Sequence, residues 1–500
     1  MDNYYTLVLV LVSIFTLSFL YIARQLSSRG SKKLPPGPLA WPIIGNLHLL
    51  LDAKPHKSIA KLAEIYGPIM SLKLGQLRVV VISSSSMAKQ VLQKQDLAFS
   101  SRFVTDSLQS HNHCKFSMAC LPVCPQWRTL RKILNINLFS SNRMDGNQHV
   151  RSQKMKELIA YCAKCSQEGE AVDVGQVAFK TNFNLISNTL FSRDLPYPFS
   201  DLKDELKDMI WGILDVAGKI NLVDFFPLLG KIDPQRIRHH ADIHFTKLFK
   251  LFGDLINERL EEKKRSHNDQ KSDVLQVFLN HSAENPQGIN QNHIKSMLLD
   301  LFVGSVDSTT STLEWAMTEL LRQPEIMKKA QSELAEVIGK GKPVEEVDLS
   351  RLPYLKFIMK ETLRMHPPAP FLIPRRVDRD VELCDYIILK GSMVLVNVWA
   401  IGQDSTFWED PLVFKPERFL SSDLDVLGQD FELIPFGAGR RMCPGLPLAL
   451  RIVPTMLGSM LNSFNWKLEA GVEPNDLDME EKVGFITPKA HPLRAIPSPL

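Results

Sequence analysis

The longest periodic stretch of the sequence runs from Asn290 to Arg322 and sets a lower limit on the size of the fold. Its apolar residues recur every three or four positions, as on one face of an α-helix, and Pro324 ends the pattern. With a rise of about 1.5 Å per residue, such a helix would be roughly 50 Å long. We therefore predict a central helix that crosses a large domain.

The middle of this predicted helix, from Gly304 to Thr312, is rich in small and hydroxylated residues. Glycine and hydroxylated residues have low helix propensity, and serine and threonine can bend the backbone hydrogen-bond ladder. The run therefore indicates either a bend that the surrounding packing tolerates or a functional site.

The whole chain is predicted to be mainly α with a minor β portion. Two β-type runs, 69–74 and 79–83, are separated by Gly75-Gln76, which predicts a small hairpin-bearing sheet. Further segments with helical spacing are 86–95, 126–140, 150–166, 203–218 and 235–264. The polar stretch 264–273 is predicted to be an exposed loop between helices.

Residues 1–23 are predicted to form a membrane anchor. Tyr4 to Ala23 carries no charge and is long enough to cross a bilayer as one helix. A cleaved signal peptide is the alternative, but the chain starts with Asp2 instead of a basic region and shows no clear small-residue cleavage site. The anchor is therefore expected to stay attached.

The segment 24–46 is predicted to be a basic flank followed by a proline-rich hinge. Arg24, Arg29, Lys32 and Lys33 follow the anchor directly, so the positive-inside rule places everything after it in the cytosol. The prolines after Leu34 fix φ and remove donors, which excludes a helix there. Residues 47–500 remain for one catalytic domain, facing the cytosol from a single-pass anchor in the endoplasmic reticulum membrane.

Charge and cysteine usage exclude two classes of protein. A net charge of +4 is far below that of a typical nucleic-acid-binding chain, so we reject nucleic acid as the primary partner. The seven cysteines show no paired rhythm, which argues against a disulfide scaffold and favours a reducing compartment.

One cysteine lies in a distinctive loop, from Pro435 to Gly445. Cys443 directly precedes a proline that suits the first position of a helix, and two arginines lie beside it. Helix N-termini and cationic neighbours favour the thiolate, which can bind iron. A phosphate-binding loop is disfavoured, because Met442 stands where a dinucleotide fingerprint needs its third glycine.

With Phe436, Gly439, Arg441, Cys443 and Gly445, this loop resembles the haem-binding loop of cytochrome P-450 monooxygenases. The resemblance covers essentially the full chain, and it is nearest to the plant microsomal group that includes geraniol hydroxylases and diterpene oxidases. It implies a cytochrome P-450 fold in which the Cys443 thiolate is the axial ligand of the iron of haem b.

The resemblance also implies which other residues contact the haem. Two carboxylates of haem need charged or polar donors. The implied cofactor-binding residues besides Cys443 are Trp127, Arg131, Arg102, Arg375, Arg441 and Phe436.

The family pattern gives the central hydroxylated run a role. It implies that Asp307 and Ser308 relay protons to the oxygen site. This chain departs from the pattern in two places, because Ser308 occupies the usual threonine position and Ser305 the usual second glycine. Serine can donate and accept a hydrogen bond but lacks the methyl group that stiffens χ1, so we expect activity with some loss of electrons to peroxide.

Glu361 and Arg364 lie three residues apart, so they share one helix face. The resemblance pairs them with Arg418 in a buried network that is structural and not catalytic. Glu319 and Arg322 have the same spacing and are predicted to form only a weak surface pair.

The implied substrate-contact residues are mostly apolar, which favours a lipophilic substrate such as a terpenoid. They are Leu301, Phe302, Gly304, Ile373 and Phe485.

The predicted function is insertion of one oxygen atom from O2 into a C–H bond. No flavin or nicotinamide motif exists in the chain, so electrons would come from NADPH through a separate NADPH-cytochrome P-450 reductase, with cytochrome b5 as a further candidate donor. Arg128, Lys132 and Arg440 would present positive charge to the reductase. Two alternatives remain open, namely a reductase-independent haem-thiolate isomerase or dehydratase and a haem-binding scaffold protein without turnover.

Overall fold

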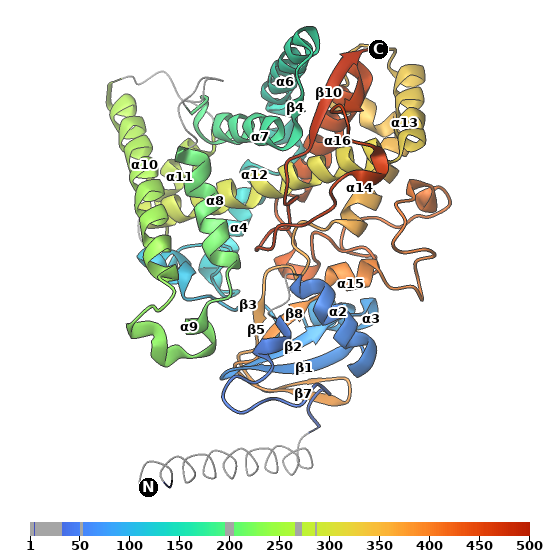
Figure 1. The fold of residues 1–500 in the computed structure, drawn as a ribbon. Coiled ribbons are helices and arrows are strands. Elements are labelled where there is room, and N and C mark those ends of the chain that lie inside the picture. The colour runs from blue at the N-terminus through green and yellow to red at the C-terminus, as the bar shows by residue number, and fades with distance from the viewer. Residues whose placement is uncertain (1–4, 6–32, 51–53, 196–204, 266–272, 286–287) are drawn as a thin grey trace.

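The computed structural model describes Tyr5 and residues 33–50, 54–195, 205–265, 273–285 and 288–500 (Figure 1). The predicted anchor lies outside these residues, apart from Tyr5, and so does most of the predicted loop 264–273. Among the residues described, no helix combines the length and the apolar character that a bilayer span requires.

Helix α12 (Gln291–Arg322) crosses the middle of the molecule, and several other helices pack against it (Figure 1). Asn290 caps its first turn by accepting the backbone N–H groups of Asn292 and His293, which satisfies donors that a helix start leaves unpaired. The periodicity of the sequence predicts this helix correctly to within one residue at its start.

Most of the described chain is helical. The remaining α-helices are α2 (Pro55–Tyr66), α3 (Ser85–Lys89), α4 (Pro125–Asn137), α5 (Ser141–Gly146), α6 (Gln148–Glu168), α7 (Val174–Phe191), α8 (Glu205–Gly218), α9 (Leu222–Phe225), α10 (Ile237–Arg265), α11 (Val274–Glu284), α13 (Pro324–Val337), α14 (Pro353–Met365), α15 (Val398–Gly402) and α16 (Leu446–Ser463). Short 3-10 turns are η1 (Leu47–Leu50), η3 (Ser107–Lys115), η4 (Pro227–Lys231), η5 (Glu346–Arg351), η6 (Pro416–Phe419), η7 (Gly439–Arg441) and η8 (Pro474–Asp476), and η2 (Gln90–Lys94) is a π-helical turn.

The helical segments predicted from spacing correspond to α3 with η2, α4, α6, α8, α10 and α12. Helix α7 escapes that analysis because apolar residues occupy most of its circumference, and many of its side chains are buried. A helix buried on all sides has no clear apolar stripe, so its periodicity is weak.

The β portion is small, as predicted. Strands β1 (Ile69–Leu74) and β2 (Leu77–Ile82) form the expected antiparallel hairpin, with Gly75 at φ +57° in the turn. They belong to a five-stranded sheet in the order β1-β2-β8-β5-β3, completed by β8 (Met393–Val396), β5 (Arg375–Arg376) and β3 (Ser101–Arg102). The other sheets are β4 (Val172–Asp173) with β10 (Arg494–Pro499) and β9 (Phe464–Leu468), and β6 (Val381–Leu383) with β7 (Tyr386–Ile388).

The described part of the proline-rich segment is extended and attached to this sheet. The backbone N–H of Ser71 donates to the carbonyl of Pro36 at 2.7 Å, and the Ser71 hydroxyl donates to the carbonyl of Pro35 at 3.0 Å. A Cβ at Gly37 would lie 1.9 Å from the Ser71 carbonyl oxygen, so only glycine permits this approach. Strand β1 therefore fixes the direction in which the chain enters the domain.

Glu319 corrects one sequence-based prediction. Its side chain is buried and not on the surface, and its Oε1 atom lies 2.8 Å from Nε2 of His366. The imidazole of His366 in turn stacks on Trp315, with ring centroids 4.1 Å apart. Arg322 is exposed and makes no ion pair with any described residue, so the motif spacing alone does not create a pair.

Glu361 is the centre of a buried ionic network between α14 and the segment 402–418. Both of its oxygens accept from Arg364 at 2.8 Å, and Oε1 also accepts from Nε of Arg418 at 2.9 Å. Arg364 donates further to the carbonyls of Gly402 and Pro411, so its desolvated charge has several partners. The network joins α14 to the chain that leads into the Cys443 loop.

We predict that Arg364→Ala destabilises the protein by about 3–5 kcal/mol, because it leaves the Glu361 carboxylate buried without its main partner. Arg322→Ala is the matched control, with the same motif spacing but an exposed side chain, and should change the free energy of unfolding by less than about 0.5 kcal/mol. Urea unfolding followed by circular dichroism measures both. Equal effects of the two variants would contradict the assignment.

Candidate active site

The Cys443 loop is closed by its own backbone and pressed against η2. The backbone N–H of Cys443 donates to the carbonyl of Phe436 at 3.0 Å, and helix α16 begins three residues later. Gly439 has φ +69°, and a Cβ there would lie 1.9 Å from the carbonyl oxygen of Leu92. Glycine is therefore required at this position for both the backbone conformation and the close packing.

The pKa of Cys443 differs in direction from the sequence expectation. Burial raises it above the ordinary value, and the backbone N–H groups of Gly445 and Leu446, together with the charge of Arg131, only partly oppose that effect. The helix terminus and cations alone thus do not produce a thiolate, because desolvation outweighs them. A metal ion bound to the sulfur would supply the missing positive charge, since metal coordination deprotonates a thiol.

Strands β3 and β5 place two arginines directly opposite each other. Arg102 and Arg375 are register partners, and Arg441 of the Cys443 loop is the third member of the group. Their side chains are buried, with 9%, 4% and 8% of their surfaces exposed, respectively. None forms an ion pair with a carboxylate in the described part of the chain. Like charges at opposing strand positions are normally destabilising, so this arrangement requires an explanation.

The pKa values of the three arginines are lowered, which agrees with an unfavourable grouping of buried like charges. Burial, followed by the charge of Arg441, lowers the pKa of Arg375 to about 10, and burial is the largest cause that lowers the pKa of Arg441 to about 10. Burial, followed by the charges of Arg375 and Arg441, also lowers the pKa of Arg102. A nearby anionic ligand would reverse the cost of gathering these cations.

Backbone carbonyls hold the three guanidinium groups in place. Arg102 donates to Ile373 O at 2.8 Å, and Arg375 donates to Phe99 O at 3.1 Å. Arg441 donates to the carbonyls of residues 100, 118 and 121. The Nε atom of Arg102 is buried without a hydrogen-bond partner. Carbonyl dipoles orient these groups but carry no net negative charge, so the residues fit an anionic group such as the carboxylates of haem.

Two residues of α4 complete this side of the site. The ring of Trp127 lies 4.8 Å from the guanidinium carbon of Arg441, and its indole N–H donates to Met118 O at 3.2 Å. Arg131 is partly buried, and burial lowers its pKa while the charge of Cys443 raises it. Phe436 packs on the other side of the loop, in a cluster with Trp408 and Phe419. The structure thus brings every predicted haem-contact residue to the surroundings of the Cys443 loop.

The predicted oxygen site lies in the middle of α12, which packs against α16. A Cβ built on Gly304 would meet no atom within 4 Å, so this face of a central helix borders open space. At about 100° per residue, Leu301 and Ser308 share that face with Gly304. The Ser308 hydroxyl donates to Gly304 O at 3.0 Å, so its oxygen can still accept a hydrogen bond.

Asp307 points toward α8. Its Oδ1 atom accepts a hydrogen bond from the indole N–H of Trp211 at 2.7 Å. From α7, the amide of Asn182 donates to Ser305 O at 2.9 Å and to Val306 O at 3.3 Å. These bonds hold the hydroxylated run from two neighbouring helices.

The predicted substrate-contact residues are distributed between the site and the core. Phe302 is buried among Phe183, Phe191 and Phe252, whose ring centroids lie 5.4, 6.0 and 5.9 Å away. It lies about 200° around the helix from Gly304, so the structure places it in the helical core and away from the open face.

The other predicted contacts lie close to functional elements. Leu301 shares the face of Gly304, and Ile373 is the residue whose carbonyl accepts from Arg102. The backbone of Phe485 touches the end of α8, because a Cβ on Gly218 would lie 2.2 Å from the Phe485 nitrogen.

Sequence reasoning did not predict the hydrogen bond from Trp211 to Asp307 or the contacts of Asn182 with α12, and it also missed Asp300. The carboxylate of Asp300 accepts the Ser117 hydroxyl at 2.8 Å and lies 3.3 Å from Nε2 of His113, which attaches the segment 107–119 to α12. An acid between Leu299 and Leu301, in an otherwise apolar run, could have indicated this contact.

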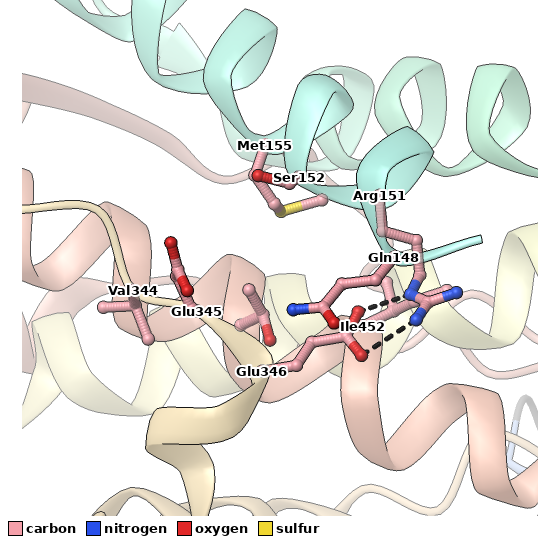
Figure 2. A pocket seen from close by; sticks show the side chains of 9 residues that line it. Gln148, Arg151, Ser152, Met155, Val344, Glu345, Glu346 and Ile452 are labelled. Atoms are coloured by element: carbon pink, nitrogen blue, oxygen red, sulfur yellow. Dashed lines mark hydrogen bonds and ion pairs between the residues drawn. The ribbon is translucent and has the colours of Figure 1, made fainter. Parts of the chain in front are cut away.

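A separate small pocket lies between α6, η5 and α16 (Figure 2). Arg151 donates to both carboxylate oxygens of Glu346 beside it, with one bond of 2.9 Å. None of its lining residues belongs to the predicted site, and the ion pair indicates a structural connection between helices.

Comparison with known proteins identifies a family and several relatives. The family model described as "Cytochrome P450" matches residues 35–493. Geraniol 8-hydroxylase of Catharanthus roseus is 62% identical over 498 residues, covering 100% of both chains. Geraniol 8-hydroxylase of Swertia mussotii is 61% identical over 97% of this chain and 98% of the relative. Geranylhydroquinone 3''-hydroxylase of Arnebia euchroma is 52% identical over 96% of this chain and 97% of the relative.

We predict that Arg102→Gln has opposite effects on the haem-free and haem-bound chain. Removing one of three like charges should stabilise the haem-free chain by about 1 kcal/mol. Losing one charge-assisted contact should increase the rate of haem loss about tenfold. Urea unfolding and transfer of haem to apomyoglobin measure the two effects.

Arg376→Gln is the matched control for this experiment. Arg376 is the neighbouring residue of β5, but its guanidinium is exposed and bonded to Asp378. It should change neither measurement appreciably. Unchanged haem loss in Arg102→Gln would contradict the role of the arginine group.

Proposed function

The chain belongs to the cytochrome P450 family and is a monooxygenase, and we propose that its substrate is geraniol or a similar acyclic terpenoid alcohol. The reaction would insert one atom of O2 into a C–H bond and reduce the other to water, with NADPH as the source of two electrons. The haem-dependent part of the proposal depends on one observation, namely that the buried arginines around the Cys443 loop have no carboxylate partner among the residues that the structure describes.

The residues around the loop fit haem b in their chemistry. Cys443 would bind the iron, and Arg102, Arg375 and Arg441 would neutralise the carboxylates, with Trp127 and Arg131 beside them. Haem, when bound, supplies the reductive activation of O2. The protein's own part is to hold the sulfur at the start of α16, where the loop closure to Phe436 fixes its position.

Asp307 and Ser308 would deliver protons on the opposite side of the site. Their backbones are adjacent on α12, so a proton can pass from a carboxylate to a neighbouring hydroxyl without a large motion. The Ser308 hydroxyl donates to Gly304 O and must rotate to donate elsewhere. Serine lacks the β-branch that restricts χ1 in threonine, so its hydroxyl is held less tightly in the orientation that delivers the proton.

The apolar lining supports a lipophilic substrate. Leu301, Ile373 and Phe485 present hydrocarbon surface, which would bind a terpenoid chain by excluding water. The two relatives above 60% identity are named for geraniol, and their likeness extends over nearly the whole chain. This likeness supports an acyclic monoterpene alcohol over a larger terpenoid.

The proposal includes a redox partner and a membrane. Arg128 and Lys132 are exposed on α4, the helix that carries Arg131, and Arg440 is exposed beside Asp96. These cations support docking of NADPH-cytochrome P-450 reductase, or of cytochrome b5, on the cysteine side of the domain. The uncharged run from Tyr4 to Ala23 and its basic flank support a single-pass anchor in the endoplasmic reticulum.

The substrate proposal is tested with the full chain in membranes containing the reductase. We expect NADPH-dependent hydroxylation of geraniol with kcat/KM at least about tenfold above that for geranylhydroquinone, because the larger ring must fit the same pocket. A haem-thiolate isomerase would act without NADPH, and a scaffold protein would show no turnover on either compound. Either result, or a preference for geranylhydroquinone, would overturn the proposal.

We predict that Ser308→Thr improves coupling. The added methyl restricts χ1, which should hold the hydroxyl closer to its productive orientation. The open space beside Gly304 leaves room for this methyl on the same helix face. The ratio of hydroxylated product to NADPH consumed should rise, and hydrogen peroxide release should fall. Thr312→Ser is a control one turn away, and an unchanged ratio in Ser308→Thr would refute the prediction.

The proposed topology is tested through a glycosylation site that the chain already contains. Asn280-His281-Ser282 is an acceptor sequence in α11, with Asn280 exposed. We expect no glycan there in microsomes, because the domain faces the cytosol. A second acceptor sequence added before Met1 should be modified. Glycosylation at Asn280 would contradict the proposed orientation, because it would place the catalytic domain in the lumen.

A further inference from the structure

The acid of the predicted proton relay is attached to a helix outside α12. Trp211 of α8 donates its indole N–H to Oδ1 of Asp307 at 2.7 Å. Hydrogen bonds to a carboxylate are shorter and stronger than neutral ones, so this contact restricts the rotamer of the acid. It leaves Oδ2 as the oxygen that Trp211 does not engage.

The indole itself is held from two other directions. Its ring makes an edge-to-face contact with Phe179 of α7, with centroids 6.0 Å apart and planes at 86°. The ammonium of Lys482 lies 5.6 Å from the ring centroid, over its face. Because both contacts orient the ring, they also set the direction of its N–H.

The same helix touches the predicted substrate region. Gly218, at the end of α8, is packed so closely against the backbone of 484–485 that a Cβ would lie 2.2 Å from the Phe485 nitrogen. A shift of the backbone at 484–485 would therefore displace the end of α8, and α8 carries Trp211 two turns earlier. The geometry connects substrate contact to the position of the acid through one rigid helix.

We propose that Trp211 is a positioning residue for proton delivery, which orients the Asp307 carboxylate through its indole N–H and couples that orientation to α8. This inference rests on the proposed monooxygenase function and adds to it a residue outside the predicted site. The proposal assigns Trp211 no direct contact with haem or oxygen. Its effect passes entirely through Asp307.

Two substitutions separate the hydrogen bond from packing. Trp211→Phe keeps an aromatic ring but removes the N–H donor, whereas Trp211→Gln keeps an N–H donor but removes the ring. If the hydrogen bond orients Asp307, Trp211→Phe should lower the rate of geraniol hydroxylation about tenfold and increase the peroxide released per NADPH consumed. Trp211→Gln, which keeps an N–H donor, should lower the rate less than Trp211→Phe does. The dissociation constant for substrate, from the Soret shift, should change less than about twofold in Trp211→Phe.

Trp466→Phe is the matched control. The indole N–H of Trp466 also donates a hydrogen bond, but its acceptor is the backbone carbonyl of Met460, at 2.9 Å, and Trp466 lies in β9. It should leave the product-to-NADPH ratio unchanged. If Trp211→Phe keeps wild-type coupling, or if Trp211→Gln is the worse variant, then the role is packing and the proposal is wrong.

A spectroscopic measurement does not depend on turnover. Ultraviolet resonance Raman spectra of the substrate-free holoenzyme report the hydrogen bonding of indole N–H groups, and Asp307→Ala should remove the signal of one strongly bonded indole. Loss of the same signal in Trp211→Phe identifies the donor. If no such signal depends on Asp307, the proposal fails, whereas absent turnover in the wild type with this signal present would instead reject the proposed function.

Discussion

Repulsion among Arg102, Arg375 and Arg441 is the constraint on which the active site depends. Pairing of β3 with β5 and closure of the Cys443 loop force three guanidinium groups together in the interior. Backbone carbonyls satisfy many of their donors but cannot cancel their charge. The fold therefore carries an electrostatic cost that an anionic cofactor would offset on binding, which would couple cofactor affinity to stability.

In the network around Glu361, by contrast, the chain itself supplies the carboxylate that neutralises the buried arginines. One fully buried carboxylate faces two guanidinium groups, and carbonyls of the segment 402–413 take the remaining donors. This network is complete without a ligand, so it shapes the core next to the Cys443 loop. The arginine group has no carboxylate partner among the described residues, so it would favour an anionic ligand. The difference lies in the presence or absence of a carboxylate, which local motifs alone do not reveal.

Local patterns in the sequence predicted several of the amphipathic helices and the β1–β2 hairpin, because each depends on neighbouring residues, although α2 and α13 were not among the predicted segments. Helix α7 was missed, since its burial erases the period. Glu319 was misplaced for a related reason, because its partner His366 lies 47 residues away. The bond from Trp211 to Asp307 spans 96 residues and depends on how α8 crosses α12. Such contacts follow from tertiary packing, which spacing does not encode.

The two ends of helix α12 stabilise the core, and its middle contains the candidate catalytic segment. Its first turn is capped by Asn290, and its last turns are buried around Trp315 and Leu320. The middle contains residues that favour a helix least, and its hydroxyls bond back to their own helix, as Ser305 does to Leu301 O at 2.5 Å. Asn182 supplies donors to carbonyls there from α7. Because both ends are held, the middle can border open space without unravelling, and Asp307 and Ser308 stay where the proposed proton relay would need them.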